Sequence, residues 1–466
     1  MTSFENETVP GRLLNQPGRS KADRVADLQP LLPKGAVAPA TGDLVMAAPF
    51  NAHDHGYGVR TLDFGGIDDA LEAWIPSLRL RPRTDPYLET LVAFGRMAKG
   101  GIAGAIHCHN SLNVDRMVDE ALAVIRAAGD VGMRLGLSCP MLDFDAWAYD
   151  GGPERLKPFL SQADWGDLSQ TIPRYAPVEA QIAAVDAVAA ANINSLVTVQ
   201  YGPIGPQWCS NALLERIAEA SALNDRRIHM HLLESPRQRH WLDRRFPQGV
   251  VTYLDEIGFL SPRLAVAHGV QLRPDEYELL AQRGVQLASN PSANLRLRSG
   301  IAPLREAVAR GLWFGIGLDG TGMDDDQDLW REMRVAYLLH GGRELTRGFT
   351  AEGLFNAVTS TAAHIVGAPE GRDQVVIDYT GLTKDSLFGD VDEAEVLLVR
   401  MTAGHVRALY VEEREIVANG KLVSVDFEAA RRELMDQARA DLPRLQQERG
   451  RSRALAEATR AYYAGW

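Results

Sequence analysis

The chain has 466 residues, of which 45% are hydrophobic, 24% charged and 7% aromatic, and this composition is typical of a large globular protein. Lysine and arginine together number 49 against 61 aspartates and glutamates, which gives a net charge of −12, and no basic block stands out. The summed field of such a chain repels phosphate backbones and anionic membrane surfaces. Binding to nucleic acid is therefore not expected.

The N-terminal segment lacks the apolar run of a secretory signal, and no window reaches the roughly 18 apolar residues of a membrane span. We therefore expect a cytoplasmic protein with no membrane partner. The three cysteines, Cys108, Cys139 and Cys209, lie far apart and lack the CxxC spacing of a structural zinc site or a redox pair. Reduced thiols are the expected state.

Short apolar, β-branched runs alternate with longer segments of helical period, and this pattern predicts a parallel sheet buried on both faces. Eight strands with interposed helices predict a distorted (β/α)8 barrel, a TIM barrel. The main alternative is a doubly wound open sheet, but its usual glycine-rich phosphate loop is missing, because NAHDHGYGVR follows the first strand. The predicted strands are residues 44–52, 102–107, 133–139, 195–202, 227–233, 263–268, 285–289 and 313–318.

We place the barrel at residues 49–377 and expect a small β-sandwich domain built from both sides of it. Residues 1–48 supply the first part of this domain and residues 378–425 the second, with Asn419-Gly420 as a hairpin turn. Its predicted strands in the second part are residues 395–401, 405–413 and 415–425.

Two further segments have a distinct character. Residues 426–466 are helical in propensity with a break at Pro443, and we expect this tail to pack on its own subunit or on a neighbour. Large acidic barrels often form symmetric oligomers, so a homo-oligomer is expected. Residues 140–178 form a long insertion after the third strand, and a loop of that length over a barrel mouth is more often functional than idle.

Polar residues with metal-binding chemistry fall at the C-terminal ends of four predicted strands, where the catalytic groups of barrel enzymes gather. His53-Asp54-His55 closes the first strand. Residues i and i+2 of a strand point to the same face, so both imidazoles could converge on one ion. Taken alone, however, an HxH triplet is mostly accidental.

The fifth strand reads HMHLLE. His231 would lie at its end as a third nitrogen ligand, and Glu234 would lie one step into the loop, close enough to handle a proton. His229 also faces inward, but one pleat deeper, and we interpret it as a hydrogen-bonded core histidine.

The sixth and eighth strands end in His268 and Asp319. A lone histidine at such a place is as often a satisfied core or surface group as a functional one. An aspartate after a buried strand is either a helix cap or a ligand. Because Gly317 and Gly320 flank the end of this strand and let a bulky ligand approach, we favour the second interpretation for Asp319.

These features occur in order along the chain, and together they resemble the motifs of the amidohydrolase superfamily. FNAHDHG resembles its first-strand metal motif, HMHLLES its HxxE strand, VAHGV its sixth-strand histidine and GIGLDGTGMDDDQDLWREMR its eighth-strand aspartate segment. Binuclear members generally carry a carbamylated lysine on strand four, and SLVTVQYGPIG has no lysine. The resemblance is therefore to the mononuclear branch, which includes cytosine deaminase and atrazine chlorohydrolase.

The resemblance implies a site with one divalent transition metal per chain, which could be Zn, Co, Fe or Mn. It further implies that Asp319 accepts a proton from the attacking water, that His268 polarises a substrate carbonyl or orients the nucleophile, and that Glu234 passes a proton to the leaving nitrogen. Such an ion can lower the pKa of bound water to roughly 7. The implied metal ligands are His53, His55, His231 and Asp319.

One departure from related deaminases bears on the substrate. Those enzymes often show a GPHAP-like segment after strand four whose histidine contacts substrate, whereas this chain has Ile204 there, which makes the pocket wall apolar. Trp208, together with Trp147 and Trp165 in the insertion, also suggests an apolar or aromatic small-molecule substrate, although any one of these tryptophans is more often a core residue than a pocket residue.

Further substrate contacts are expected from Asn290, in the segment SNPSANLRLRSGIAP that resembles the loop after strand seven, and from one of His107 and His109, with the other pointing outward. The run Asp324-Asp325-Asp326 is interpreted as a cap for the following helix rather than as a second metal site, because a helix N-terminus favours carboxylates.

We therefore expect a metal-dependent hydrolase that cleaves a carbon–nitrogen bond of a small apolar amide, carbamate, thiocarbamate or urea and releases an amine. The shortened N-terminal layer and the long third loop are similar to those of molinate and phenylurea hydrolases. The alternative is an aminohydrolase, a deaminase or dechlorinase acting on a pyrimidine, purine or triazine, with the same metal site. A non-catalytic scaffold is a third hypothesis, but such proteins usually lose ligands that are all present here.

Overall fold

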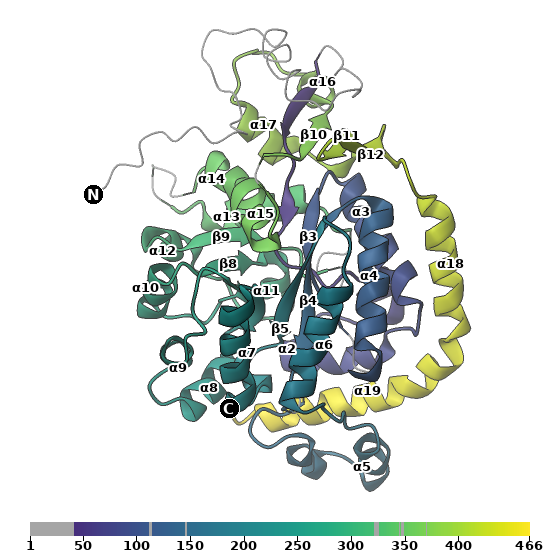
Figure 1. Cartoon of the computed structure of the whole chain (residues 1–466), viewed down its shortest axis with the longest axis vertical. Helices are drawn as coiled ribbons and strands as arrows, with labels where there is room; N and C mark the ends of the chain where they lie inside the picture. Colours follow the sequence, from purple (N-terminus) through teal and green to yellow (C-terminus); the bar gives the residue numbers. More distant parts are fainter. Residues whose placement is uncertain are drawn as a thin grey trace.

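The computed structural model describes residues 42–110, 114–144, 147–320, 326–343, 345, 349–369 and 371–466. Eight parallel strands form one sheet whose spatial order follows the chain, with helices around its outside (Figure 1). The strands are β2 (Phe50–Asn51), β3 (Gly104–Cys108), β4 (Arg134–Met141), β5 (Val197–Pro203), β6 (Ile228–Leu232), β7 (Leu264–His268), β8 (Gln286–Ser289) and β9 (Trp313–Ile316).

The sheet curls until its last strand meets its first. The Ala52 amide donates a 2.9 Å hydrogen bond to the carbonyl of Ile316, and the amides of Leu318 and Asp319 donate to the carbonyl of His53 at 3.0 and 2.9 Å. These bonds nearly close the barrel and confirm the predicted (β/α)8 fold. They also fix the ends of β2 and β9 side by side. The predicted metal ligands His53, His55 and Asp319 follow these two strands.

Helices cover the outer face of the barrel because each presents one apolar stripe to the strands. In α4, for example, Met117, Ala121, Val124 and Ala128 are buried at intervals of three or four residues. The helices around the barrel are α3 (Pro86–Lys99), α4 (Met117–Val131), α6 (Val178–Ala191), α7 (Asn211–Asn224), α8 (Pro236–Arg245), α9 (Val250–Glu256), α10 (Pro274–Gln282), α11 (Pro291–Arg296), α12 (Leu304–Ala309), α13 (Leu329–His340), α14 (Ala351–Asn356) and α15 (Ala362–Val366).

The predicted first strand, residues 44–52, is wrong as a single element. It divides into β1 (Leu44–Ala47), which belongs to a second sheet, and β2 of the barrel. Pro49 lies between them, and a proline has no amide with which to continue a ladder. The Ala48 amide still donates to Asp373 in the second sheet, whereas the Pro49 carbonyl already accepts from Ala103 in the barrel.

The second sheet is antiparallel, with the order β1, β10 (Gln374–Ile377), β11 (Val406–Val411), β12 (Arg414–Ala418) and β13 (Lys421–Leu422). Segments from before and after the barrel therefore build it, as expected, although β10 lies within the range that we assigned to the barrel. Within the described ranges it is one sheet and not the expected sandwich. Most of residues 1–48 lie outside those ranges.

The predicted strand at residues 395–401 is also wrong, because this segment is the helix α17 (Glu393–Arg400). The carboxylate of Asp392 accepts a 3.1 Å hydrogen bond from the Glu395 amide and caps the helix. Ala394, Leu397 and Leu398 are buried on one side, a spacing of three and four that a short apolar run did not distinguish from a strand. The helix α16 (Tyr379–Thr383) precedes it.

One buried ion pair joins the barrel to the small sheet. The guanidinium of Arg134, at the start of β4, donates to the two oxygens of Asp373 at 2.6 and 3.1 Å, and both side chains are almost fully buried. Glu412, the second partner of Arg134, is half exposed. Asp373→Asn should therefore lower the free energy of unfolding by roughly 3 kcal/mol, because it leaves a buried cation poorly compensated.

Urea unfolding followed by circular dichroism measures this loss. Glu428→Gln is the matched control, because the pair between Glu428 and Arg431 is half exposed and its loss should be too small to measure. Equal losses in the two variants would contradict the assignment of the Arg134 pair as a stabilising link.

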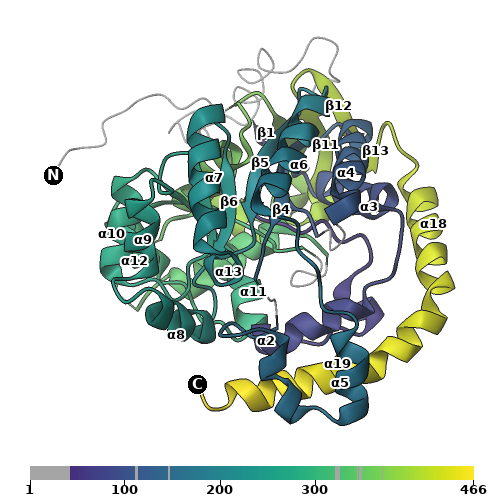
Figure 2. The same ribbon diagram turned by 60° about the horizontal axis from the view of Figure 1, so that its bottom comes forward.

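The tail forms two helices, α18 (Phe427–Ala440) and α19 (Leu442–Tyr463), and Pro443 lies in the first turn of α19, where its missing amide is tolerated. Both helices pack on their own chain. The helix α18 lies against α3, and α19 runs beside α2 (Leu71–Trp74), the 3-10 helix η3 (Ile75–Leu80) and α5 (Gln162–Ser169) of the insertion (Figure 2). The expected oligomer stays a prediction.

Two other expectations concern the whole chain. Across the described residues, no helix combines the length and the apolar character that crossing a bilayer requires. Cys108, Cys139 and Cys209 are buried and form no disulfide, as expected.

Candidate metal centre and active site

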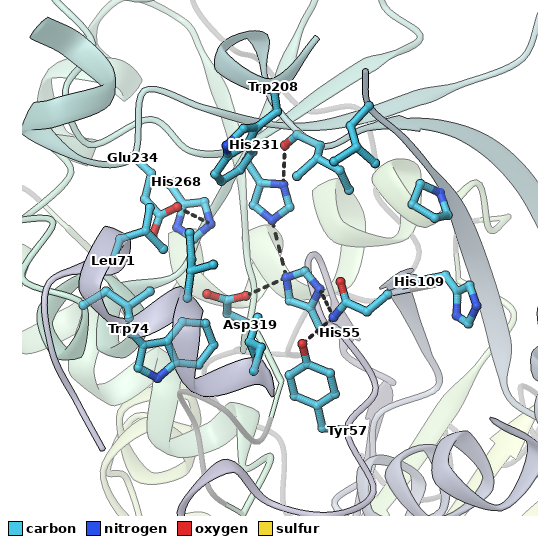
Figure 3. A pocket seen from close by; sticks show the side chains of 17 residues that line it. His55, Tyr57, Leu71, Trp74, His109, Trp208, His231, Glu234, His268 and Asp319 are labelled. Carbon is cyan, nitrogen blue, oxygen red and sulfur yellow. Dashed lines mark hydrogen bonds and ion pairs between the residues drawn. The ribbon is translucent and has the colours of Figure 1, made fainter. Parts of the chain in front are cut away.

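The C-terminal ends of β2, β6, β7 and β9 bring the predicted functional residues to one place. His53 and His55 follow β2, His231 lies in β6, His268 ends β7 and Asp319 follows β9. Figure 3 shows the side chains of four of these five residues, all but His53, facing one cavity, with Glu234 beside His268.

Three imidazoles and one carboxylate converge within this group. The Nε2 atoms of His53 and His55 lie 3.3 and 3.1 Å from Oδ1 of Asp319. Nε2 of His231 lies 3.4 Å from Nε2 of His55. Ligand atoms of the three histidines all lie within 4.8 Å of one another, and the same is true of His53, His268 and Asp319.

The opposite ring nitrogens show that these residues fit a metal ion. Nδ1 of His231 lies 2.7 Å from the carbonyl oxygen of Ile204, and Nδ1 of His55 lies 3.2 Å from that of Cys108. A carbonyl oxygen only accepts, so Nδ1 of His231 carries the proton and this ring turns the lone pair of its Nε2 to the centre. Nδ1 of His55 also lies 3.2 Å from Nδ2 of Asn110. The buried Nε2 of His53 makes no hydrogen bond with any described residue. Three imidazole nitrogens and a carboxylate suit a divalent transition metal.

Burial and mutual contact set the charges of this group. Burial lowers the pKa of His53 and lowers that of His231 well below its usual value. Burial alone would raise the pKa of Asp319, but the facing imidazoles of His53 and His55 hold it well below the usual range. Burial would also lower the pKa of His55, yet its contact with Asp319 raises it. The site therefore keeps an ionised carboxylate beside the neutral imidazoles of His53 and His231.

His229 holds the ring of the candidate ligand His53 in place. Its Nε2 lies 2.8 Å from Nδ1 of His53, the two rings stack, and the side chain is 1% exposed. The interpretation of His229 as a hydrogen-bonded core histidine is confirmed. A histidine that contacts a ligand through its second nitrogen orients that ligand.

The backbone at the strand ends is held in an unusual conformation. Leu233, His268 and Asp319 have φ values of 50°, 71° and 57°, in the left-handed region that non-glycine residues rarely adopt. Each such residue costs about 1–3 kcal/mol, and such residues cluster at functional sites. The hydrogen bond from the Asp319 amide to His53 is one of the contacts that hold this conformation.

Gly317 has a role that differs from the expected one. A Cβ at Gly317 would lie 2.7 Å from Cβ of His53 and would collide with Oδ1 of Asn290. This glycine therefore lets His53 and Asn290 approach β9 closely, rather than admitting a ligand.

Glu234 and His268 form a second pair beside the candidate metal site. Oε2 of Glu234 lies 3.7 Å from Nε2 of His268, and its Oε1 accepts a 3.4 Å hydrogen bond from Ser299. Burial, followed by the charges of Asp319 and Glu72, raises the pKa of Glu234 well above its usual value. Burial lowers the pKa of His268 to about 4. Burial therefore favours the protonated form of Glu234, as a proton donor requires, and His268 is a neutral ring at neutral pH.

The tautomer of His268 follows from its neighbours. Its Nδ1 lies 2.9 Å from Oδ1 of Asn294, which accepts, so Nε2 carries the lone pair. This ring can therefore orient an attacking water by accepting its hydrogen bond. It cannot donate a proton from Nε2 to a substrate carbonyl unless it first gains one.

The cavity has a volume of about 180 Å³. Its polar lining residues are His55, Tyr57, His109, Asn110, His231, Glu234, His268 and Asp319. Its apolar lining residues, which we call the apolar wall, are Leu71, Trp74, Ile75, Leu78, Pro140, Leu142, Ile204, Trp208 and Leu297. Apart from the two indole N–H groups, its side chains offer no hydrogen-bonding group.

Ile204 and Trp208 line the cavity as the sequence suggested, whereas Trp147 and Trp165 follow the alternative interpretation and are packed elsewhere. Trp147 packs with Leu455 and Ala458 of α19, and Trp165 lies under the ammonium of Lys157. Neither residue lines the cavity. The insertion folds as a small cluster of its own against the tail, so its aromatic side chains are used there.

The ambiguity between His107 and His109 is resolved, since His109 lines the cavity and His107 lies behind it. Nδ1 of His109 lies 3.3 Å from Nε2 of His107, and its Nε2 lies 3.1 Å from Glu120. Both nitrogens of His109 are thus already engaged. The predicted substrate contact of Asn290 is not supported, because Asn290 is fully buried and its Nδ2 lies 3.3 Å from Nδ1 of His268.

Several cavity residues were missed, above all Leu71, Trp74 and Tyr57 in the segment between β2 and α3. The apolar spacing of Leu71 and Trp74 gives a weak helical signal, but no local pattern indicates which face of so short a helix meets the site. The predicted cap at residues 324–326 was displaced, because Asp328 caps α13 by accepting from the amides of Trp330 and Arg331. Asp324 and Asp325 lie outside the described residues, and Asp326 pairs with Arg331.

The site and the barrel define a hydrolase that acts on carbon–nitrogen bonds. Residues 44–371 match the model of the amidohydrolase family, and the chain belongs to this family.

Individual relatives extend the comparison. The chain is 25% identical over 400 residues to the 5'-deoxyadenosine deaminase of Methanosarcina mazei, covering 84% of this chain and 83% of that protein. Its fold is similar to that of an adenosine deaminase from Xanthomonas campestris with bound zinc, with a TM-score of 0.70, 20% identity and 87% of each chain covered. It is also similar to a variant of atrazine chlorohydrolase from Arthrobacter aurescens with zinc and atraton, with a TM-score of 0.73, 21% identity and 85% and 88% covered.

Proposed function

We propose that the chain is a metal-dependent aminohydrolase, which displaces an amino group or another small leaving group from an aromatic heterocycle by attack of water. The observation that carries the proposal is the convergence of three histidine Nε2 atoms and Asp319 beside the buried Glu234. A deaminase and a chlorohydrolase among the similar proteins support this reaction over amide or urea cleavage, which the sequence placed first.

The four convergent side chains would hold one divalent transition metal, and zinc is our first choice because both structural neighbours bind it. When bound, such an ion supplies a nucleophilic water of lowered pKa. The ligands of the ion would be His53, His55, His231 and Asp319.

The other steps fall to the side chains themselves. The ionised carboxylate of Asp319 takes the proton of the attacking water, while Nε2 of His268 orients that water by accepting its hydrogen bond. Glu234 donates its proton to the ring nitrogen beside the attacked carbon. The proton collected by Asp319 then leaves with the departing amine, and the proton of the added hydroxyl returns to Glu234 as the carbonyl forms. The carbon therefore gains an oxygen and loses ammonia, and both carboxyl groups regain their starting states.

The apolar wall restricts the rest of the substrate. A site that binds a ribose supplies hydrogen-bond partners for its hydroxyls, and leaving hydroxyls unpaired in such a wall is unfavourable. We therefore infer a heterocycle with alkyl or aryl substituents rather than a nucleoside.

The test is a panel of compounds incubated with zinc-loaded protein. We expect ammonia, alkylamine or chloride from N-alkylated aminotriazines, with kcat/KM at least about tenfold above that for adenosine and 5'-deoxyadenosine. Asp319→Asn protein is the control for contaminating activity. Silence on every heterocycle, together with amine release from an N-aryl-N',N'-dimethylurea or a dialkyl thiocarbamate, would contradict the proposal.

Amine release from the urea or the thiocarbamate would support a second candidate function. The apolar wall also suits a small apolar amide, carbamate, thiocarbamate or urea, as in molinate and phenylurea hydrolases. Glu234 would then protonate the leaving amine directly.

Trp208→Ala tests the apolar wall. We expect KM for an N-alkylated substrate to rise about tenfold, because the indole supplies contact area, while kcat stays within about threefold. Steady-state kinetics measure both constants. Trp165→Ala, an aromatic change away from the cavity, should leave both unchanged. A fall in kcat at constant KM in Trp208→Ala would show that the indole acts on the reaction rather than on binding.

A further inference from the structure

A buried carboxylate lies behind the apolar wall, outside the cavity lining. Glu72 belongs to α2, whose residues Leu71 and Trp74 face the cavity, and it is itself 6% exposed. A carboxylate taken out of water needs hydrogen-bond donors. The hydroxyl of Tyr149 donates to its Oε1 at 3.0 Å, and the hydroxyl of Ser235 donates to the same oxygen. The buried Oε2 has no hydrogen-bond partner among the described residues.

Ser235 connects Glu72 to the proton donor of the site, because it directly follows Glu234. While its proton goes to Glu72, its oxygen accepts a 3.2 Å hydrogen bond from the Gln238 amide and so caps α8. The side-chain carbonyl of Gln238 in turn accepts a 2.8 Å hydrogen bond from the Glu234 amide. The backbone around Glu234 is therefore fixed at two points, one of which leads to Glu72.

The Glu234 carboxyl has weaker anchors of its own. Among the described residues, its oxygens contact only Ser299 at 3.4 Å and His268 at 3.7 Å, and both distances are long. Leu233, the preceding residue, is in the left-handed conformation. The direction of this side chain therefore depends on the turn that Ser235 holds.

The other donor to Glu72 leads to the cavity wall and the tail. The Tyr149 ring packs against Trp208 and Tyr463 with centroids 5.9 and 5.5 Å apart, and the Tyr149 amide donates a 3.1 Å hydrogen bond to the Tyr463 hydroxyl. Glu72 thus joins α2, the Trp208 side of the wall and the turn that carries Glu234.

We propose that Glu72 is a positioning residue for Glu234, which holds the Ser235 turn in place and keeps a second negative charge near the Glu234 carboxyl. The inference rests on the proposed function, because it takes Glu234 as the proton donor. The titratable groups that face Glu234 are Asp319, Glu72 and the neutral His268. Burial raises the pKa of Glu234 most, and the charges of Asp319 and Glu72 raise it further.

Glu72→Gln tests the charge of Glu72 apart from its hydrogen bonds. Glutamine keeps an acceptor for Tyr149 and Ser235 but has no charge. Glu234 must be protonated to act, so activity falls as the pH rises through its pKa. Without the charge of Glu72 this alkaline limb of kcat should move to lower pH by at least about half a unit. Glu276→Gln is the control, because Glu276 is equally buried, on α10, paired with Arg239, and should leave the limb in place.

Ser235→Ala removes the hydrogen bond between Ser235 and Glu72 and leaves the charge of Glu72. We expect kcat to fall about tenfold, with KM nearly constant and the alkaline limb in place. The reason is that the orientation of the Glu234 side chain changes while its pKa does not. Ser235→Thr restores the hydroxyl and should recover most of kcat. Should Glu72→Gln fail to fold, this pair decides, and wild-type kcat in Ser235→Ala would overturn the proposal.

A readout that needs no substrate is the infrared absorption of protonated carboxyl groups in zinc-loaded protein, with Glu234→Gln identifying the band of Glu234. Its midpoint should be lower in Glu72→Gln than in wild type. An unchanged midpoint and limb in Glu72→Gln would overturn the role of Glu72 alone. Wild-type activity in Glu234→Gln would instead overturn the proposed function.

Discussion

Asp319→Asn should lower kcat by about 10⁴-fold, and this is the largest effect that we expect from a single substitution. The carboxylate of Asp319 lies 3.3 and 3.1 Å from the Nε2 atoms of His53 and His55, and its depressed pKa keeps it ionised and ready to take a proton. An amide keeps one oxygen for an ion but cannot serve as this base. Folding should be little affected, because the Asp319 amide that bonds to His53 is retained.

The measurement combines product release at saturating zinc, elemental analysis of metal and circular dichroism. We expect about one divalent ion per chain in the wild type, retained in Asp319→Asn at high zinc and largely lost in His231→Ala, which removes an Nε2 ligand. Full activity of Asp319→Asn would overturn both the proton role and the metal assignment of this residue. Two ions per chain would mean that a bridging set of ligands exists beyond those identified.

Glu234→Gln should lower kcat by about 10²- to 10⁴-fold, with metal content unchanged and KM within about threefold. The carboxyl of Glu234 is buried beside His268, and burial raises its pKa and favours its protonated form, whereas a glutamine has no proton to transfer. The change is nearly isosteric, so the cavity should keep its shape.

Comparing two leaving groups sharpens this experiment. In the proposed mechanism Glu234 protonates the ring nitrogen, which a chlorinated substrate and its amino analogue share, so the loss in Glu234→Gln should be similar for both. Ser299→Ala is the matched control, because it removes the neighbour of Glu234 at 3.4 Å and leaves the proton donor in place. A clearly smaller loss for the chlorinated substrate would mean that Glu234 also delivers the proton of the leaving amine.

The errors of sequence reasoning have identifiable physical causes. Pro49 interrupts the run at residues 44–52, and the two halves pair in different sheets, β1 with the distant β10 (Leu44 with Ile377) and β2 with β3 (Phe50 with Gly104). The run at residues 395–401 contains apolar residues at both strand and helix spacing, and the Asp392 cap together with burial selects the helix.

The sequence by itself determined the barrel and the places of His53, His55, His231, Glu234, His268 and Asp319. Strand periodicity is local, and parallel strands in one barrel must end at the same edge, so residues at their ends meet there. The sequence also indicated Ile204 and Trp208 in the apolar wall, but only the tertiary structure decided the rest of this wall and the Glu72 cluster. Leu71, Trp74 and Tyr149 come from connecting segments without strand periodicity, and their contacts depend on how distant segments and the tail pack together.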